Sequence, residues 1–330
     1  MSDITNNTNT SDTLKVMGQK DMKQVATKQL VVKIVSMILV YAFLFAIAII
    51  VIFPFYFMLI SSVKSPSEFE QIRPSLLPWQ FNGGNNWTSH IDWHNYAEVF
   101  TNDNLALGQL MLNTLFVGIV STILSLIITV LSAFAFARLE FKGKNALFAA
   151  LLATMMIPGE LFTVTNYGTV VLFGKDTFLN GMLSWMGKNT FGVLIVPFLV
   201  SVFYIYLLKQ NFQQVPNELY LAAKVDGTND FKYLWKVMIP LALPTIISIT
   251  ILKMMGSWNS YAWPKLVAND QAHSLITNGL REAFKDGAGK TADIPLQMAA
   301  VTVVTIPLFL VFVFLRKYIM KGVSRSGIKG

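Results

Sequence analysis

The stretch PNELYLAAKVDGTNDFKYLWKVMIPLALP, residues 216–244, is largely polar and lies between two long apolar runs. Pro216 stands at a natural first-turn position, Glu218 follows it, and Asp226-Gly227 ends the first half, which predicts a short helix with a stop. Thr228 is expected to cap a second short helix through its hydroxyl. The stretch therefore predicts an elbow, in which two short helices are joined by a glycine turn.

Such an elbow suits a mechanical role better than a chemical one. Ala222 and Ala223 remove side-chain bulk, so that another surface can approach closely. Gly227 can take the positive φ that a sharp stop after a helix requires. We expect a stiff knob through which a cytosolic partner moves the membrane spans. The alternative is an amphipathic pair of surface helices with no partner.

This segment resembles the loop of binding-protein-dependent ABC importer permeases that carries their Glu-Ala-Ala and distal Gly signature. The matching positions are, in order, Pro216, Glu218, Leu219, Ala222, Ala223, Asp226, Gly227, Ile239-Pro240-Leu241 and Pro244. One position departs from the family, because the residue before the alanine pair is usually Glu and is Leu221 here. The chain therefore lacks whatever that glutamate contributes to docking.

In the family that this segment resembles, the elbow sits in a groove of the ATP-hydrolysing subunit. The resemblance therefore implies a set of ATPase-coupling residues in this chain. They are Glu218, Leu219, Ala222, Ala223, Asp226, Gly227 and Pro240.

The composition is that of a membrane protein. Hydrophobic residues make up 54% of the chain and charged residues only 13%, against about 25% charged residues in an average globular domain. The absence of Cys removes disulfides, thiol catalysis and thiolate metal sites. The three histidines lie outside the apolar runs, so we expect no metal site within the membrane.

Hydropathy predicts an all-α polytopic membrane protein with six transmembrane helices, since about 20 apolar residues cross a bilayer. The expected spans are residues 34–60, 112–137, 146–167, 190–208, 241–261 and 295–315. The first run is too long for a signal-peptide core, so we read it as a retained span. Pro158-Gly159 is expected to bend the third span, and Pro197 to break the fourth.

The domain organisation follows from these spans. Residues 1–33 form a disordered and basic amino-terminal segment, 34–315 a six-span permease domain with its coupling loop at 213–240, and 316–330 a carboxyl-terminal tail. If the amino terminus is cytoplasmic, 17 Lys and Arg residues lie in the inner segments and 8 in the outer ones. The positive-inside rule then places both termini and the elbow, between spans 4 and 5, in the cytoplasm. The net charge of +8 needs no nucleic acid to explain it.

The resemblance extends over roughly residues 34–330, towards the carbohydrate-uptake branch and in particular the second permease subunit of maltose-type importers. The stretches that carry it are Phe53-Pro54 to Ser62 with Lys64, Asn95-Tyr96, Asn113-Thr114, Ala135-Phe136-Ala137-Arg138, Met156-Ile157-Pro158, Trp258-Asn259, Trp263-Pro264 and the tail 327–330. The resemblance implies three kinds of partner: an ABC ATPase dimer, a second homologous permease and an extracytoplasmic substrate-binding protein. It also implies a multi-pass location in the cytoplasmic membrane of a prokaryote.

Trp258, Asn259, Tyr261 and Trp263 lie at the outer end of the fifth expected span. Sugars stack their CH faces on aromatic rings and hydrogen-bond to amides, so these residues are candidates for the substrate pathway. The alternative is an aromatic belt at the membrane interface, which enriches Trp and Tyr for physical reasons alone.

Glu160 and Lys253 are the charges nearest the membrane interior. A charge at mid-bilayer costs about 2.5–3.5 kcal/mol on insertion scales, which favours a polar cavity or a partner. Both are therefore candidates for the substrate pathway. The alternatives are that Glu160 meets water near the outer surface and that Lys253 snorkels or pairs structurally.

We therefore predict a transport subunit, not an enzyme, that forms half of a pathway for a sugar or oligosaccharide. The chain has no phosphate-cradling G-x-x-x-x-G-K-[ST], so it binds no cofactor itself, and ATP and Mg are expected on the partner ATPase. One alternative is a glycerol-phosphate importer permease, for which Lys253 is the single cation within a span. Another is an ion-coupled secondary carrier, which usually shows intramembrane ionisable groups.

Overall fold

The computed structural model describes residues 8–66, 80–82, 86–88, 91–102, 105–173, 184–284 and 293–324. Contacts divide the chain into two units, residues 1–60 and 61–330. The first unit is formed by the helix α1, Thr8–Ser61, whose Gln29–Ser61 portion is long and apolar enough to cross a membrane. This helix begins well before residue 34, in the segment that composition predicts to be disordered, and residues 1–7 lie outside the described part.

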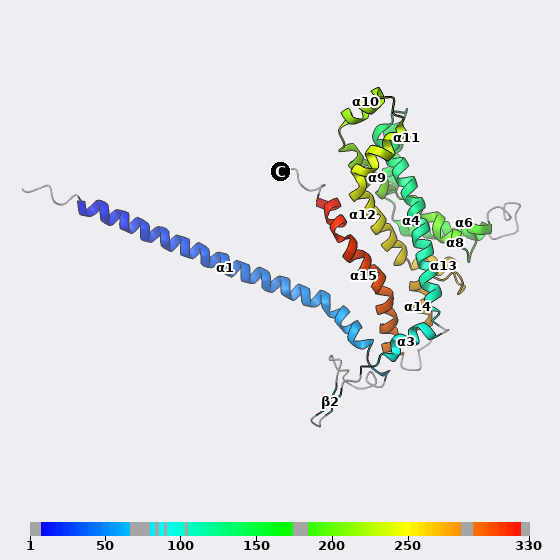
Figure 1. The fold of residues 1–330 in the computed structure, drawn as a ribbon, viewed down its shortest axis with the longest axis horizontal. Coiled ribbons are helices and arrows are strands. Elements are labelled where there is room, and N and C mark those ends of the chain that lie inside the picture. Colours follow the sequence, from blue (N-terminus) through cyan, green and yellow to red (C-terminus); the bar gives the residue numbers. More distant parts are fainter. Residues whose placement is uncertain are drawn as a thin grey trace, which may run out of the picture. The chain divides into compact units, whose positions relative to one another are not determined.

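The second unit is a helical bundle around α4, Leu107–Arg138. This helix packs against α9, Val202–Gln213, and α12, Ile239–Trp258, and α12 also packs against α15, Ile294–Ser324 (Figure 1). From Gly118 to Ala133 the buried residues of α4 are all small, which lets helices approach closely inside a membrane. At Gly118, for example, an added Cβ would lie 2.9 Å from the Met254 sulfur of α12.

Two of the expected spans are bent close to their prolines, as the sequence predicted. The helices α5, Lys144–Thr154, and α6, Gly159–Phe173, meet at 92° around Pro158. The pair formed by α8, Phe191–Ile195, with the short 3₁₀ turn Val196–Phe198 meets α9 at 46°, close to Pro197. Proline lacks an N–H and clashes with the preceding turn, which explains both breaks.

Four helices are long and apolar enough to span a membrane, and the two bent pairs bring the number to six if each pair is one span. The described fold is helical apart from one antiparallel pair of three-residue strands, β1, Gln80–Asn82, and β2, Asn86–Thr88, which lies between the first two expected spans. The all-helical membrane architecture is therefore confirmed.

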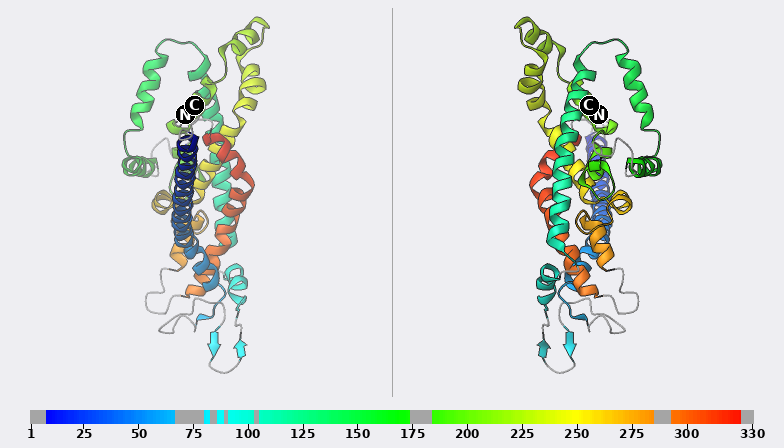
Figure 2. Two further views of the ribbon diagram at one scale, coloured as in Figure 1. Left: turned by 90° about the vertical axis from the view of Figure 1, so that its left-hand side faces the viewer. Right: turned by 90° about the vertical axis from the view of Figure 1, so that its right-hand side faces the viewer.

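The bundle has two distinct ends. The helices α10, Asn217–Val225, and α11, Asp230–Tyr233, lie at one end. The helices α3, His94–Thr101, and α14, Ile276–Ala283, lie at the opposite end, with α13, Ala262–Val267, closer to that end than to the first (Figures 1 and 2). The long helix α4 connects the two ends.

At the end away from α10, short polar groups hold neighbouring segments together. Asn95 of α3 donates from Nδ2 to the carbonyl oxygens of Ser62, 3.0 Å away, and Lys64, 2.8 Å away. Asn113 of α4 donates from its side chain to the carbonyls of Ala272 and Ser274, at 2.8 and 3.0 Å. The stretches Ser62 to Lys64 and Asn95-Tyr96, which were quoted separately from the sequence, are thus packed against each other.

Candidate functional site

The elbow has the local geometry that its sequence predicts, with one correction. Gly227 takes a φ of +70°, and the Thr228 N–H reaches back to the Ala223 carbonyl at 2.9 Å. This 6→1 hydrogen bond behind a left-handed glycine is a Schellman stop. The cap of the next helix is Asn229, whose side chain accepts from the Lys232 N–H at 2.8 Å, and not Thr228 as predicted. Thr228 is already used by the preceding stop.

The second helix of the elbow is not a separate short helix. From Asp230 the chain continues through one π-helical stretch, Leu234–Met238, into α12, so that residues 230–258 are one span-length helix. Pro240 follows the π-helical stretch, and the missing N–H and bulky ring of a proline favour such a widened turn before it. The elbow is therefore joined rigidly to the span that follows it.

Polar contacts brace the two elbow helices against each other. The Tyr220 hydroxyl donates to Asp230 Oδ1 at 2.7 Å, and Lys224 Nζ lies 2.7 Å from the same oxygen. The Tyr220 ring also packs on Tyr233 with centroids 5.1 Å apart. The hydrogen bond to Asp230 raises the pKa of Lys224, and burial followed by the Asp230 hydrogen bond raises the pKa of Tyr220. Lys224 is thus protonated, and Tyr220 neutral, throughout the physiological range.

Arg138, the last residue of α4, fastens the elbow to the bundle. Its guanidinium donates to the Phe212 carbonyl at 2.9 Å, to the Val215 carbonyl, and to the Asn217 side-chain oxygen at 3.1 Å. Only 8% of the residue is exposed. Phe212 lies in the last turn of α9, where unpaired carbonyls favour a cation. One buried charge therefore joins α4, the end of α9 and the start of α10.

The outer surface of the elbow is free of contacts within the described chain. Among the predicted coupling residues, Glu218, Leu219, Ala222, Asp226, Gly227 and Pro240 are exposed, whereas Ala223 packs against the hydrophobic cluster beneath. Leu221 and Val225 add exposed apolar side chains, and Val225 is 88% exposed. Together these residues give α10 an apolar face that the rest of the bundle does not cover.

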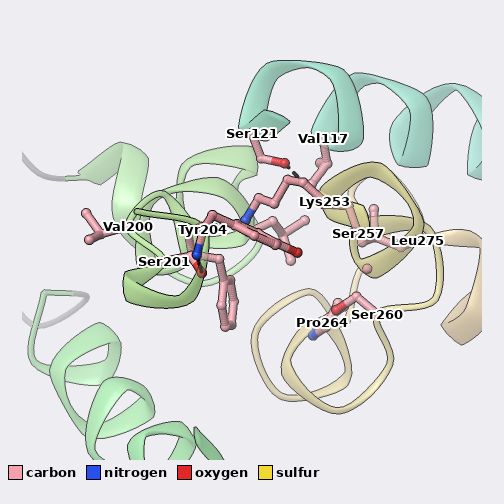
Figure 3. A pocket seen from close by; sticks show the side chains of 13 residues that line it. Val117, Ser121, Val200, Ser201, Tyr204, Lys253, Ser257, Ser260, Pro264 and Leu275 are labelled. Atoms are coloured by element: carbon pink, nitrogen blue, oxygen red, sulfur yellow. Dashed lines mark hydrogen bonds between the residues drawn. The ribbon is translucent and has the colours of Figure 1, made fainter. Parts of the chain in front are cut away.

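A cavity of about 390 Å³ lies deeper in the bundle, beside the break in the α8–α9 pair (Figure 3). It is lined by Val117 and Ser121 of α4, Leu194, Phe198, Val200, Ser201 and Tyr204 of the broken pair, Lys253, Gly256 and Ser257 of α12, and Ser260, Pro264 and Leu275. Ser121 and Ser257 share a hydrogen bond of 3.2 Å across the cavity wall. The hydroxyls come from several helices, so the chemistry of the cavity is not visible in any one stretch of sequence.

Lys253 reaches from α12 across this cavity to the break. Its ammonium donates to the carbonyl oxygen of Phe198. Phe198 ends the 3₁₀ turn before the 46° bend, so its carbonyl is free to accept from a side chain. Irregular backbone at membrane depth is tolerated where it lines a cavity, and Lys253 occupies such a place.

The other predicted pathway residues do not gather around Lys253. Trp258 is 3% exposed and lines a different pocket together with Asn259, whereas Trp263 is buried with its indole N–H on the Val193 carbonyl at 2.9 Å. Both tryptophans are therefore packed inside the bundle, unlike an aromatic belt. Glu160 is exposed in the first turn of α6, directly after the 92° bend.

Tyr261 belongs to a second cavity of about 280 Å³. Lys265 and Arg281 both lie over its ring, at 5.4 and 4.8 Å from the centroid, and Glu282 also lines the cavity. The hydrogen bond from Lys265 lowers the pKa of the Tyr261 hydroxyl. This cavity thus pairs an aromatic surface with cations at the end of the bundle away from α10.

Sequence reasoning missed the role of Arg138 and the serines of the cavity. A single arginine closing an apolar span was the available signal for the first. The serines of the cavity gave no such signal, because their hydroxyls come from segments that are distant in the sequence. Within the described residues, no group of three His, Asp or Glu side chains is close enough to hold a metal ion.

Comparison with known proteins gives consistent matches over most of the chain. The family described as binding-protein-dependent transport system inner membrane component matches residues 16–325. One relative is a probable ABC transporter permease protein, MG189 of Mycoplasma genitalium. It is 27% identical, and the match covers 94% of this chain and 93% of the relative. A polygalacturonan/rhamnogalacturonan transport system permease protein of Bacillus subtilis, YtcP, is also 27% identical, over 88% of this chain and 97% of its own.

A solved structure has a similar fold. It is a chain of a bacterial ABC transporter involved in the import of the acidic polysaccharide alginate, with a TM-score of 0.70 and 22% sequence identity. The match covers 85% of this chain and 95% of that one. The likeness is one of fold, because the two chains share a similar arrangement of helices.

Proposed function

The chain belongs to the family of binding-protein-dependent transport system inner membrane components, and from this premise we propose how it imports its substrate. It is a permease subunit of a carbohydrate ABC importer and a multi-pass protein of the prokaryotic cytoplasmic membrane. Its substrate is a sugar or oligosaccharide, in keeping with the relatives named above.

The working importer contains this chain, a second homologous permease, a dimer of ABC ATPases and an extracytoplasmic binding protein. The binding protein delivers the substrate, the two permeases form the pathway between them, and ATP and Mg bind to the ATPases. The chain crosses the membrane six times with both termini in the cytoplasm, each bent pair being one span. This orientation rests on the excess of Lys and Arg in the segments on the elbow side.

The observation that carries the proposal is the elbow and its continuity with α12. The face of α10 formed by Leu221, Ala222 and Val225 is exposed and has no partner among the described residues, as expected of a surface that docks into a groove. A helix rises about 1.5 Å per residue, so one helix carries a displacement at Asp230 over about 35 Å to Lys253. Movement of the ATPases would thus reach the cavity directly.

The substrate pathway runs past the cavity that holds Lys253. Asn259 and Tyr261 lie towards the end of the bundle at which the binding protein delivers substrate. We also include the buried Trp258 and Trp263 and the exposed Glu160 in the pathway, outside this cavity, because none of the three lines it. One observation favours the second candidate substrate, a glycerol phosphate: the cation that lines the cavity is suited to a phosphate.

Co-purification from the native membrane tests this proposal. We expect the wild-type chain to bring down an ATPase, a second permease and a binding protein. The substitution Val225→Glu should lose the ATPase alone, because Val225 makes no contact on which the fold depends. The matched control Asn259→Glu adds the same charge at an exposed site near the opposite end and should keep the ATPase. A chain that comes out alone and transports with an ion gradient but without ATP would overturn the proposal in favour of a secondary carrier.

A further inference from the structure

The charge of the Lys253 cavity is unbalanced. Lys253 is the only ionisable Lys, Arg, Asp, Glu or His side chain among the described residues that line it. None of the ion pairs found within the described part of the chain includes Lys253. The cavity wall therefore presents one positive charge without a matching carboxylate among the residues that the structure describes.

A structural role accounts for only part of this arrangement. The Phe198 carbonyl takes one of the three N–H donors of the ammonium. An alkyl side chain would fill the same space beside the broken helix without the cost of placing a charge at membrane depth. Lys253 is partly exposed and lines the cavity, and an ionisable side chain at membrane depth that faces a cavity is typical of a substrate or ion pathway.

The remaining lining suits a ligand rich in hydroxyl groups. Ser201, Tyr204, Ser257 and Ser260 bring hydroxyls to the cavity, and each hydroxyl can both donate and accept. The ring of Tyr204 and the side chains of Phe198 and Leu275 supply apolar surface against which CH groups pack. The volume of about 390 Å³ lies within the range of roughly 300–1,000 Å³ that small-molecule sites occupy.

We propose that this cavity is a subsite for the anionic group of the transported substrate, a carboxylate or a phosphate, which the Lys253 ammonium holds. The inference rests on the proposed function and narrows it to substrates that are both polyhydroxylated and negatively charged. A uronate and a glycerol or sugar phosphate share this chemistry. The ammonium already bonded to Phe198 offers its remaining donors to the anion, so the broken helix holds Lys253 in position for binding.

The test measures equilibrium binding to the membrane complex of two permeases and two ATPases in lipid nanodiscs. The binding protein is left out, so that it does not bind the probes itself. The probes are digalacturonate and glycerol 3-phosphate, with the neutral galactobiose and glycerol as their uncharged counterparts. We expect one anionic probe to bind, and more weakly as salt increases. Which of the two binds identifies the anion as carboxylate or phosphate.

Three variants separate a ligand from a structural contact. Lys253→Met should weaken binding of the anionic probe by about 10- to 100-fold, the usual effect of losing a charge-assisted hydrogen bond. Lys253→Arg should retain most of the affinity, and Lys265→Met, which removes a cation from the second cavity, should leave it unchanged.

Several outcomes would overturn this inference. They are equal binding of charged and neutral probes, no binding of either anionic probe, and an unchanged affinity in Lys253→Met. If the importer assembles and hydrolyses ATP normally but gives any of these results, this inference fails and the proposed function stands. Loss of the ATPase from the purified wild type would instead contradict the proposed function.

Discussion

The two ends of α4 are both held by buried polar side chains, but with different chemistry. At the elbow end, the charged Arg138 binds carbonyls of Phe212 and Val215 and the side chain of Asn217. At the other end, the neutral Asn113 binds the carbonyls of Ala272 and Ser274, and Thr114 accepts from the Ile276 N–H at 2.9 Å. A charge-assisted clamp holds the end of the bundle that carries the elbow, and neutral contacts hold the opposite end.

The two ends of the bundle differ in how they are attached. The elbow is a small body with an exposed outer face, and Arg138 fastens its start to α4 and to the end of α9. The opposite end is fastened at many weaker points. If the proposed ATPase pulls on α10, we expect α12 and the end of α9 to move with it. We therefore expect substitutions at the two ends to have effects of different size.

The largest effect is expected at the elbow clamp. Arg138→Met leaves two carbonyls and the Asn217 side chain without their donor, and hydrogen bonds to charged groups contribute about 1.5–3 kcal/mol each. We expect the free energy of unfolding in detergent to fall by about 3 kcal/mol, with the elbow loosened in hydrogen exchange. Lys142→Met removes the same charge from an exposed site at this end and should change stability little. An equal loss in both variants would contradict the clamp.

A smaller effect is expected at the other end of α4. Asn113→Leu keeps the shape of the side chain but removes the donors to Ala272 and Ser274, and we expect a loss of about 2 kcal/mol. Hydrogen exchange should increase around residues 272–276 and stay unchanged in the elbow. Asn259→Leu, whose amide bonds only its own helix, is the matched control. A loss larger than that of Arg138→Met would reverse the comparison.

The smallest effect on stability is expected at the glycine turn of the elbow. Gly227→Ala must place a Cβ at a φ of +70°, which costs roughly 1–2 kcal/mol for an L-residue. No atom lies within 4 Å of the added Cβ, so strain and not a clash is responsible. We expect a lower melting temperature and weaker coupling between ATP hydrolysis and transport. Gly168→Ala has equal space at an ordinary helical φ in α6, where Ala is favoured over Gly, and should lower neither. Gly227→Ala with full wild-type stability would show that the turn is not strained.

Local chemistry explains what the sequence could predict. The Gly227 turn, the proline bends and the apolar spans each depend on residues within a few positions of one another. The capping residue was predicted one position too early, because Thr228 and Asn229 are both good caps and only the backbone decides between them. The continuity of α11 with α12 was missed, because it depends on how the turn before Pro240 widens.

Long-range contacts explain what the sequence could not predict. Arg138 meets Phe212 and Val215 only once α4 and α9 are packed together. The hydroxyls of the Lys253 cavity come from separate helices in the same way. Lys253 could be predicted as a candidate from the sequence, because a charge within an apolar span costs free energy whatever the packing of the helices.

Labelling of single cysteines tests most directly whether α10 faces the cytoplasm and seats the ATPase. The natural chain has no Cys, so Val225→Cys and Asn259→Cys each introduce one reactive thiol at an exposed site. With a membrane-impermeant maleimide, Val225→Cys should react only in inside-out vesicles, and only after the ATPase has been stripped away. Asn259→Cys should react from the opposite side in either case. Reaction of Val225→Cys in right-side-out vesicles, or equal reaction with the ATPase bound, would contradict the account.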